Sequence, residues 1–164
     1  MLRSVALFSD KATDSDLQPV IEGCRKLIRS TSKMSVDLEN LPDLLMVAKN
    51  EKDEVVGLVS LFYTGGTKAW KVGTIAVCKD IRPELVTKFL LDGACSAIRI
   101  KCVGLQRAWM VQKVKLTNSR NIAWLNTLGF SLPERWQDNF LSDDGFVPFD
   151  PFEEILMKKS IFSE

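Results

Sequence analysis

The side chains that most often carry nucleophilic or metal chemistry are few in this sequence. It contains four cysteines (Cys24, Cys78, Cys95 and Cys102) and no histidine. Without histidine, the Ser–His–Asp and Cys–His schemes of catalysis are excluded, as are His-ligated metal sites. The cysteines show no C-x-x-C spacing and the carboxylates do not cluster, so no metal centre is predicted. Buried thiols in a reduced, cytosolic protein are the simplest interpretation, and Cys78 is predicted to be a core cysteine.

The stretch NSRNIAWLNTLGF, from Asn118 to Phe130, has the most specific pattern of residues. Asn118 is a good N-cap, because its amide oxygen can accept hydrogen bonds from the first helical turn. Ile122, Leu125 and Leu128 recur every three residues and form one apolar helical stripe. Gly129 then suits the left-handed conformation that ends a helix. The pattern predicts a short amphipathic helix that turns tightly into a strand at Phe130.

This stretch resembles the last helix of the GNAT superfamily of N-acetyltransferases, in which an Asn leads through a Tyr to Leu-Gly-Phe. The matching positions are Asn118, Leu125, Leu128, Gly129 and Phe130. The Tyr that many family members use to protonate the leaving thiolate falls on Leu125. The resemblance implies acetyl-CoA as the acyl donor and an amine as the acceptor, with Asn118 contacting the pantetheine arm.

In that family, the helix after the fourth strand binds the pyrophosphate of acetyl-CoA through its first-turn N–H groups. The family motif, Gln/Arg-x-x-Gly-x-Gly/Ala, aligns with the run that begins at Arg82. Leu85 and Thr87 occupy the two glycine positions, Pro83 removes one N–H donor, and Glu84 adds a negative charge. The resemblance assigns cofactor binding to Val77, Arg82, Leu85, Val86, Thr87, Lys88 and Asn118. An amphipathic scaffold helix with a Pro-Glu start explains the same run equally well.

Acyl transfer requires a deprotonated amine, a polarised thioester carbonyl and protonation of the leaving thiolate. The resemblance assigns the carbonyl contact to the backbone N–H of Val77. It identifies no general acid or base, because Leu125 replaces the Tyr and Tyr63 is far from the motif. Asp80 and Glu84 are the nearest carboxylates, and both are predicted to be solvated residues at a helix start. Proximity alone can still support transfer from a bound thioester.

The hydrophobic periodicity predicts a mixed α/β (α+β) fold of the GNAT type. We expect one domain over residues 1–164, with a twisted sheet of six or seven strands and helices on both faces. Gly57, inside one strand, indicates either a close approach to the backbone or a bulge. The predicted strands span residues 2–8 (an edge strand), 44–49, 54–62, 69–78, 106–111, 130–136 and 154–161. The strands at 44–49 and 54–62 are apolar on both faces and flank a polar hairpin turn at Asn50–Asp53. The predicted helices span about 14–30, 83–99 (with Leu85 on its apolar stripe) and 118–128.

Composition bounds the class of protein. Apolar residues are 46% and charged residues 26% of 164, as in an ordinary globular domain, and the formal net charge of +1 gives no basic field for nucleic acid. No apolar run reaches the roughly 18 residues of a membrane helix. The four tryptophans lie inside apolar runs, so core packing explains them better than base stacking does.

The last helix, lacking the Tyr, also resembles GNAT-like proteins of tailed bacteriophages, as does the Asp144-Gly145-Phe146 run with Phe149. This implies a viral origin, in the host cytoplasm or in the virion. Two hypotheses therefore stand. The first is an acyl-CoA-dependent N-acetyltransferase. The second, motivated by Leu85, Thr87 and Leu125, is a catalytically degenerate GNAT fold that acts as a protein-binding or phage virion-associated component. The acidic 137–152 segment would cover an acceptor site or contact a partner.

Overall fold

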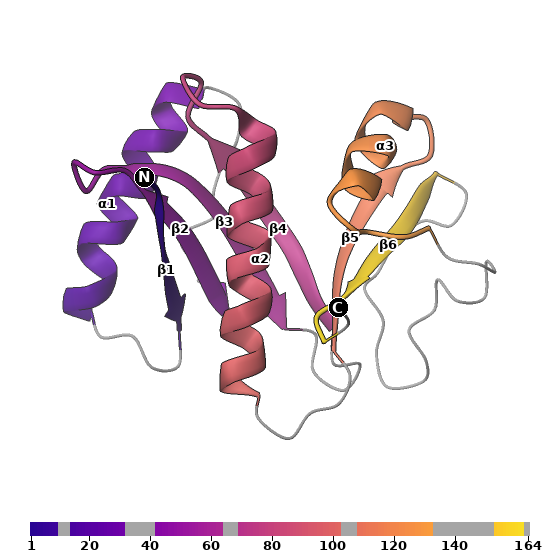
Figure 1. Ribbon diagram of the computed structural model, residues 1–164, viewed down its shortest axis with the longest axis horizontal. Helices are drawn as coiled ribbons and strands as arrows, with labels where there is room; N and C mark the ends of the chain where they lie inside the picture. The colour runs from indigo at the N-terminus through magenta and orange to yellow at the C-terminus, as the bar shows by residue number, and fades with distance from the viewer. Residues whose placement is uncertain (10–13, 32–41, 64–68, 103–107, 133–152, 163–164) are drawn as a thin grey trace. The chain divides into compact units, whose positions relative to one another are not determined.

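A computed structural model describes residues 1–9, 14–31, 42–63, 69–102, 108–132 and 153–162. The elements of these residues appear in Figure 1 and follow the predicted order. They are β1 (Arg3–Phe8), α1 (Asp14–Thr31), β2 (Leu44–Lys49), β3 (Val55–Tyr63), β4 (Ala69–Val77), α2 (Pro83–Lys101), β5 (Trp109–Lys115), α3 (Ser119–Thr127) and β6 (Glu154–Ser160).

The six strands form one mixed sheet in chain order, β1-β2-β3-β4-β5-β6. Strands β1, β2 and β3 pair antiparallel, β4 pairs parallel with β5, and β5 pairs antiparallel with β6. The parallel pair is joined through α2, as a parallel connection requires. The mixed α/β sheet predicted from the sequence is therefore confirmed, with β1 at its edge as expected.

The described residues form two compact units that share β4. The first unit contains residues 1–62 and 73–101, and therefore β1, β2, most of β3, the end of β4, α1 and α2. The second contains residues 63–72 and 102–164, and therefore the start of β4, β5, α3 and β6. The prediction of one domain over the whole chain stays a prediction, and each unit is described below by itself.

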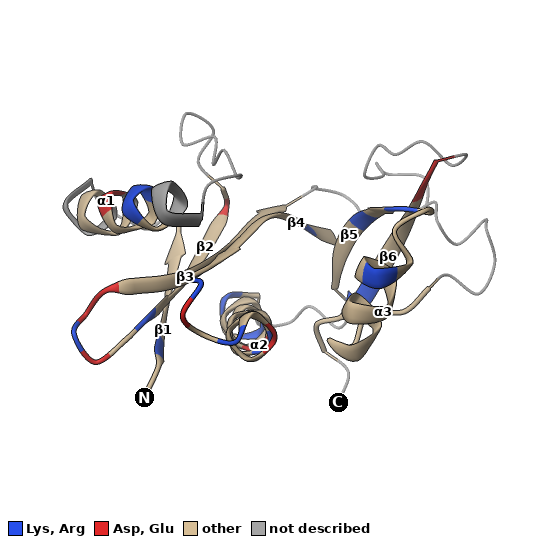
Figure 2. Ribbon diagram, turned by 90° about the horizontal axis from the view of Figure 1, so that it is seen from above, with Lys and Arg blue, Asp and Glu red and all other residues tan. Residues whose placement is uncertain are grey.

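In the first unit, helices cover both faces of the central strands (Figure 2). Val20, Cys24 and Leu27 of α1 pack against one face, where Leu45 and Leu58 are buried. Helix α2 lies on the other face and contacts β1 and β2. All but the ends of β2 and β3 are buried, which confirms that these strands are apolar on both faces because helices cover each side.

Gly57 in β3 makes room for α2. A Cβ added at this position would lie 2.7 Å from Cγ1 of Val86 and 3.2 Å from Cδ1 of Leu90, both in α2. The register between β2 and β3 also shifts beside it, since Ala48 pairs with Gly57 but Lys49 pairs with Val55. Both alternatives for this glycine therefore apply, because a close approach and a bulge occur together.

The turn between β2 and β3 is organised by Asn50, as its position in the predicted hairpin suggests. The Asn50 side-chain oxygen accepts hydrogen bonds from the N–H groups of Lys52 and Glu54, each at 3.0 Å. Asp53 takes the left-handed conformation with φ of 64°, which Asp tolerates better than most residues do.

The second unit confirms the capping pattern of α3. The Asn118 side-chain oxygen accepts a hydrogen bond from the N–H of Asn121 at 3.1 Å. At the other end Gly129 has φ of +96°, and its N–H donates to the carbonyl of Asn126. The N–H of Phe130 donates to the carbonyl of Leu125, which completes a Schellman motif. The helix therefore begins and ends as the sequence predicts.

One predicted strand end was wrong, and another predicted strand is described only in part. Strand β5 runs from Trp109 to Lys115 rather than stopping at Val111, because its polar residues continue to pair with β6 as far as Lys115 opposite Glu154. The strand predicted over residues 130–136 appears as a single antiparallel bridge between Ser131 and Lys158, and its remainder lies outside the described residues. The acidic 137–152 segment also lies outside them.

Candidate functional site

Val77 is the last residue of β4, and its backbone N–H is directed away from β3. The N–H of the next residue, Cys78, donates to the carbonyl of Val56 in β3 at 2.8 Å. Successive N–H groups along a strand point to opposite sides. The N–H of Val77 is therefore directed to the side of β4 opposite β3. This orientation suits a donor that meets a ligand at the strand's edge.

Arg82, the fifth residue after the end of β4, leads into α2. The Arg82 carbonyl accepts the first intrahelical hydrogen bond, from the N–H of Val86 at 3.3 Å, and Pro83 is the first helical residue. The N–H groups of Glu84 and Leu85 thus have no acceptor one turn back inside the helix. They lie at the positive end of the dipole of a 19-residue helix. The Arg82 side chain is exposed at the same end.

The two residues at the family's glycine positions point in different directions. Leu85 is 60% exposed, although the sequence predicted it on the buried stripe of α2. Thr87 is fully buried, and its hydroxyl has no hydrogen-bond partner among the described residues. Val86 is also fully buried. Because Thr87 and Val86 pack into the protein, their side chains do not cover the helix N-terminus, whereas Glu84 and Leu85 are exposed there.

Lys88 pairs along its own helix. Its amino group lies 2.8 Å from the Asp92 carboxylate, and this hydrogen bond and charge raise the pKa of Lys88. Ion pairs between a Lys and an acidic side chain four residues away are common on the surface of helices. The structure therefore directs this side chain toward the C-terminal side, away from the start of α2, where the sequence assigned it to phosphate.

Asn118 belongs to the second unit, whereas Val77 and the Arg82–Lys88 run belong to the first. The role that the structure gives Asn118 is the N-cap of α3, and its contact with pantetheine stays a prediction. Leu125, at the position of the family's Tyr, is fully buried. Tyr63 is 43% exposed and packs on Trp70, with 5.0 Å between the ring centroids.

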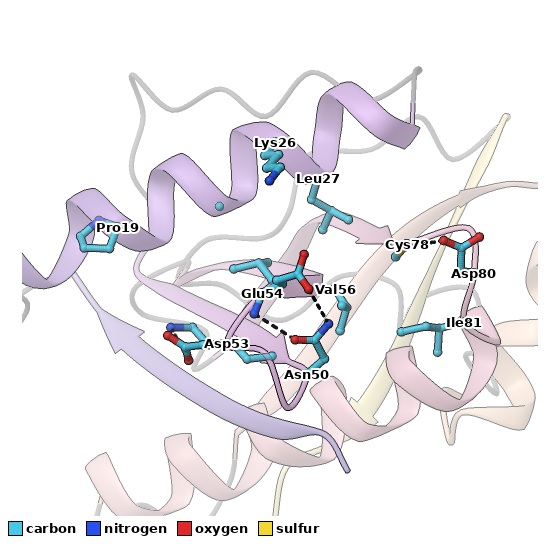
Figure 3. A pocket seen from close by; sticks show the side chains of 13 residues that line it. Pro19, Lys26, Leu27, Asn50, Asp53, Glu54, Val56, Cys78, Asp80 and Ile81 are labelled. Carbon is cyan, nitrogen blue, oxygen red and sulfur yellow. Dashed lines mark hydrogen bonds and ion pairs between the residues drawn. The ribbon is translucent and has the colours of Figure 1, made fainter.

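A cavity of about 620 Å³ lies in the first unit between α1, the β2–β3 turn and the β4–α2 turn (Figure 3). The sequence did not predict it, because its walls come from three segments that are far apart in the chain. Cys78 lines it and is half-buried while packing against the core that contains Cys24 and Leu27, so the prediction of a core cysteine is confirmed only in part. The Cys78 thiol lies 4.0 Å from the Asp80 carboxylate, which lines the same cavity.

The other thiols differ in environment. Cys24 and Cys95 are buried as predicted, whereas Cys102 is half-buried just after α2. Within the part of the chain that the structure describes, no group of acidic, cysteine or histidine side chains could hold a metal ion. Among the same residues, no helix is both long and apolar enough to cross a membrane.

Titration of Cys24 gives a testable dependence of stability on pH. The side chain is 1% exposed, and burial raises the pKa of its thiol from 9.0 to about 11, while the charge of Lys49 acts in the opposite direction. The folded state thus favours the neutral thiol, and this contribution is present below pH 9.0 and lost as the pH rises toward 11. Between pH 8 and pH 10, we expect the free energy of unfolding to fall by about 1 kcal/mol more in the parent than in Cys24→Val.

Urea denaturation of both proteins at the two pH values measures this difference. The Cys24→Val variant is the control, since it loses the thiol but keeps an apolar side chain in the core. An equal decline in the two proteins would show that Cys24 is not the group responsible.

The fold defined by this sheet and these helices matches that of GNAT acyltransferases. One match is the ribosomal-protein-S18-alanine N-acetyltransferase from Escherichia coli, with a TM-score of 0.63 and 16% identity over 100% of this chain and 96% of that one. Another is an acetyltransferase of the GNAT family from Staphylococcus aureus, with a TM-score of 0.60 and 13% identity over 98% and 99%. A third is an acyl-CoA N-acyltransferase from Pseudomonas aeruginosa, with a TM-score of 0.61 and 13% identity over 97% and 99%.

No protein-family model and no curated protein matches the sequence. At identities of 13–16%, the structural likeness establishes the fold. The resemblance to phage proteins stays a prediction.

Proposed function

We propose that this protein is an N-acyltransferase of the GNAT type, which transfers an acyl group, acetyl in the simplest case, from acyl-CoA to an amine. The observation that carries the proposal is the arrangement at the end of β4. There a strand-edge N–H at Val77 is followed closely by the exposed N-terminus of α2. The likeness of the whole chain to GNAT acyltransferase structures supports it.

The residues at the start of α2 fit the phosphates of CoA. The N–H groups of Glu84 and Leu85 supply backbone donors, and the helix dipole attracts anions. Arg82 supplies a cation that is exposed at the same end. Thr87 is buried, so its side chain does not cover these donors. Backbone donors of this kind do not depend on the two glycines of the family motif.

Acyl-CoA would supply the activated acyl group, and the chain's own contribution is to bind, orient and polarise. The Val77 N–H is placed to donate to a carbonyl oxygen on which negative charge develops. Among the described residues we identify no side chain as general acid or base. We therefore expect catalysis to rest on proximity and carbonyl polarisation, with protons exchanged through water.

The Arg82 assignment makes a specific prediction for binding. We expect Arg82→Ala to weaken acetyl-CoA affinity about tenfold, as the loss of one charge-assisted hydrogen bond should. Isothermal titration calorimetry with acetyl-CoA and with free CoA measures the effect. The matched control is Arg99→Ala, in which the same residue type is removed from the last turn of α2. Lys88→Ala should also leave the affinity close to that of the parent.

Two outcomes would contradict the proposal. If acetyl-CoA at millimolar concentration does not bind the parent but binds Leu85→Gly, the chain is a GNAT fold that has lost its cofactor. If acetyl-CoA binds the parent and Arg82→Ala binds equally well, the phosphates are held elsewhere.

A further inference from the structure

The cavity in the first unit has charges of opposite sign on different walls. Lys26 extends from α1, Glu54 comes from the β2–β3 turn, and Asp80 comes from the β4–α2 turn. Figure 3 shows the Lys26 side chain directed from α1 toward the hairpin and the Glu54 side chain directed toward α1. One wall is therefore basic and the two others are acidic.

Not all charges of the cavity are available to a ligand. Lys49, whose side chain is 16% exposed, lies 3.5 Å from the Asp53 carboxylate, and Asp53 also pairs with Arg3. Lys26 and Asp80, in contrast, form no ion pair with any residue that the structure describes. Glu54 accepts a bond from the Asn50 side chain at 3.3 Å, which leaves further acceptor capacity on its carboxylate.

The floor of the cavity is apolar. Leu27 and Val56 are buried there, and Val55 and Ile81 are half-buried. Helix α1 approaches this floor closely at Gly23, where an added Cβ would lie 2.7 Å from Cγ2 of Val55. A concave site of a few hundred Å³ with an apolar floor and a few convergent polar groups is typical of a small-molecule site.

We propose that this cavity binds a small zwitterionic amine with an apolar body, such as an α-amino acid with an aliphatic side chain. Its ammonium group would face the acidic walls formed by Glu54 and Asp80, and its carboxylate would face Lys26. Its side chain would lie on the apolar floor. Cys78 lines the cavity and directly follows Val77, so the ligand would lie near the end of β4, on its β3 side, whereas the Val77 N–H is directed to the other side. That this amine is the acyl acceptor rests on the proposed function, whereas its binding does not.

Three probes with the same apolar body test each part of the recognition. L-leucine carries both charges, L-leucinamide lacks the carboxylate, and 4-methylpentanoate lacks the ammonium group. We expect L-leucine to bind with an affinity of the order of 1 mM, and each of the other two to bind about two- to fivefold more weakly. If all three probes bind equally well, or if none of them binds, the proposal is overturned.

Variants of the chain give the complementary test. Glu54→Gln and Asp80→Asn should each weaken L-leucine binding about two- to fivefold while leaving the binding of 4-methylpentanoate unaffected. Lys26→Gln should weaken L-leucine binding by a similar factor while leaving the binding of L-leucinamide unaffected. Glu51→Gln is the matched control, because Glu51 is an exposed residue of the same hairpin turn that does not line the cavity. If Glu51→Gln weakens L-leucine binding as much as Glu54→Gln does, the loss reflects the net charge of the protein, and the assignment of the ligand to this cavity is wrong.

Alkylation of Cys78 locates the ligand directly. At about ten times its Kd, L-leucine should slow the reaction of Cys78 with iodoacetamide about tenfold, as simple competition requires. Cys102, half-buried but not lining the cavity, is the internal control in the same mass spectrum. Equal protection of both thiols, or of neither, would overturn the location.

A separate titration with acetyl-CoA distinguishes the two proposals. If L-leucine protects Cys78 and acetyl-CoA does not bind, the ligand site stands and the acyltransferase proposal falls. If acetyl-CoA binds and no probe protects Cys78, the acyltransferase proposal stands and the ligand site falls.

Discussion

Replacing Leu125 with alanine is expected to lower the free energy of unfolding by about 3 kcal/mol, within the range for a large apolar side chain removed from a core. Leu125 is fully buried in α3, and its carbonyl accepts the N–H of Phe130 in the turn that ends the helix. Chemical denaturation measures the loss. Leu116→Ala is the control, because Leu116 is 45% exposed in the same unit and should cost less than about 0.5 kcal/mol.

The same position tests whether the missing Tyr can be restored. Because Leu125 is enclosed, Leu125→Tyr should overpack the core and cost about 1–3 kcal/mol. Its phenol would not reach a ligand at the surface, so we expect no gain in acyl transfer to any amine. A faster reaction without loss of stability would show that this site opens to substrate and that the substitution supplies a general acid.

Replacing Gly57 with leucine is expected to cost about 3 kcal/mol or more, at the upper end of overpacking penalties. The first atom of the new side chain would already lie within 2.7 Å of Cγ1 of Val86, and the rest would displace α2 further. The expected loss is measured by denaturation and, for the helix start, by the affinity for acetyl-CoA.

A second substitution shows whether the clash is the cause. Val86→Ala removes the atom that Gly57→Leu would strike, so the double variant should recover part of the stability lost by Gly57→Leu. Purely additive losses would mean that Gly57 is needed for its backbone conformation beside the register shift and not for the space it leaves.

Much of the fold could be predicted from local patterns. The caps of α3 are encoded by Asn118 and Gly129, whose conformational preferences act within a few residues. The hairpin turn depends on Asn50 and Asp53 in the same way. Continuous apolar runs in β2 and β3 indicated helices on both faces, which the structure confirms. These features could be predicted because they depend on residues that are close together in the sequence.

The site was less predictable because it depends on the direction in which side chains point and on segments that are far apart in the sequence. Leu85 and Leu90 have the same side chain, yet Leu85 is 60% exposed and Leu90 is fully buried, because they lie on different faces of α2. The burial of Thr87, at a family glycine position, could not be read from its type. The cavity beside Cys78 joins three segments, so no local pattern pointed to it. The local signal for it is Gly23, a glycine inside a helix, which lets α1 approach Val55 closely.

The division of β4 between the two units limits where the chain can be truncated. Ala69 and Trp70 are buried, and Ala69, Trp70 and Lys71 pair with β5, although they precede α2 in the chain. A fragment ending at Lys101 would keep every helix and every strand residue of the first unit. It would also carry the start of β4 as an unpaired apolar edge, which invites association between copies. Neither unit is a contiguous stretch of sequence, so no single truncation or proteolytic nick releases one without exposing part of the other.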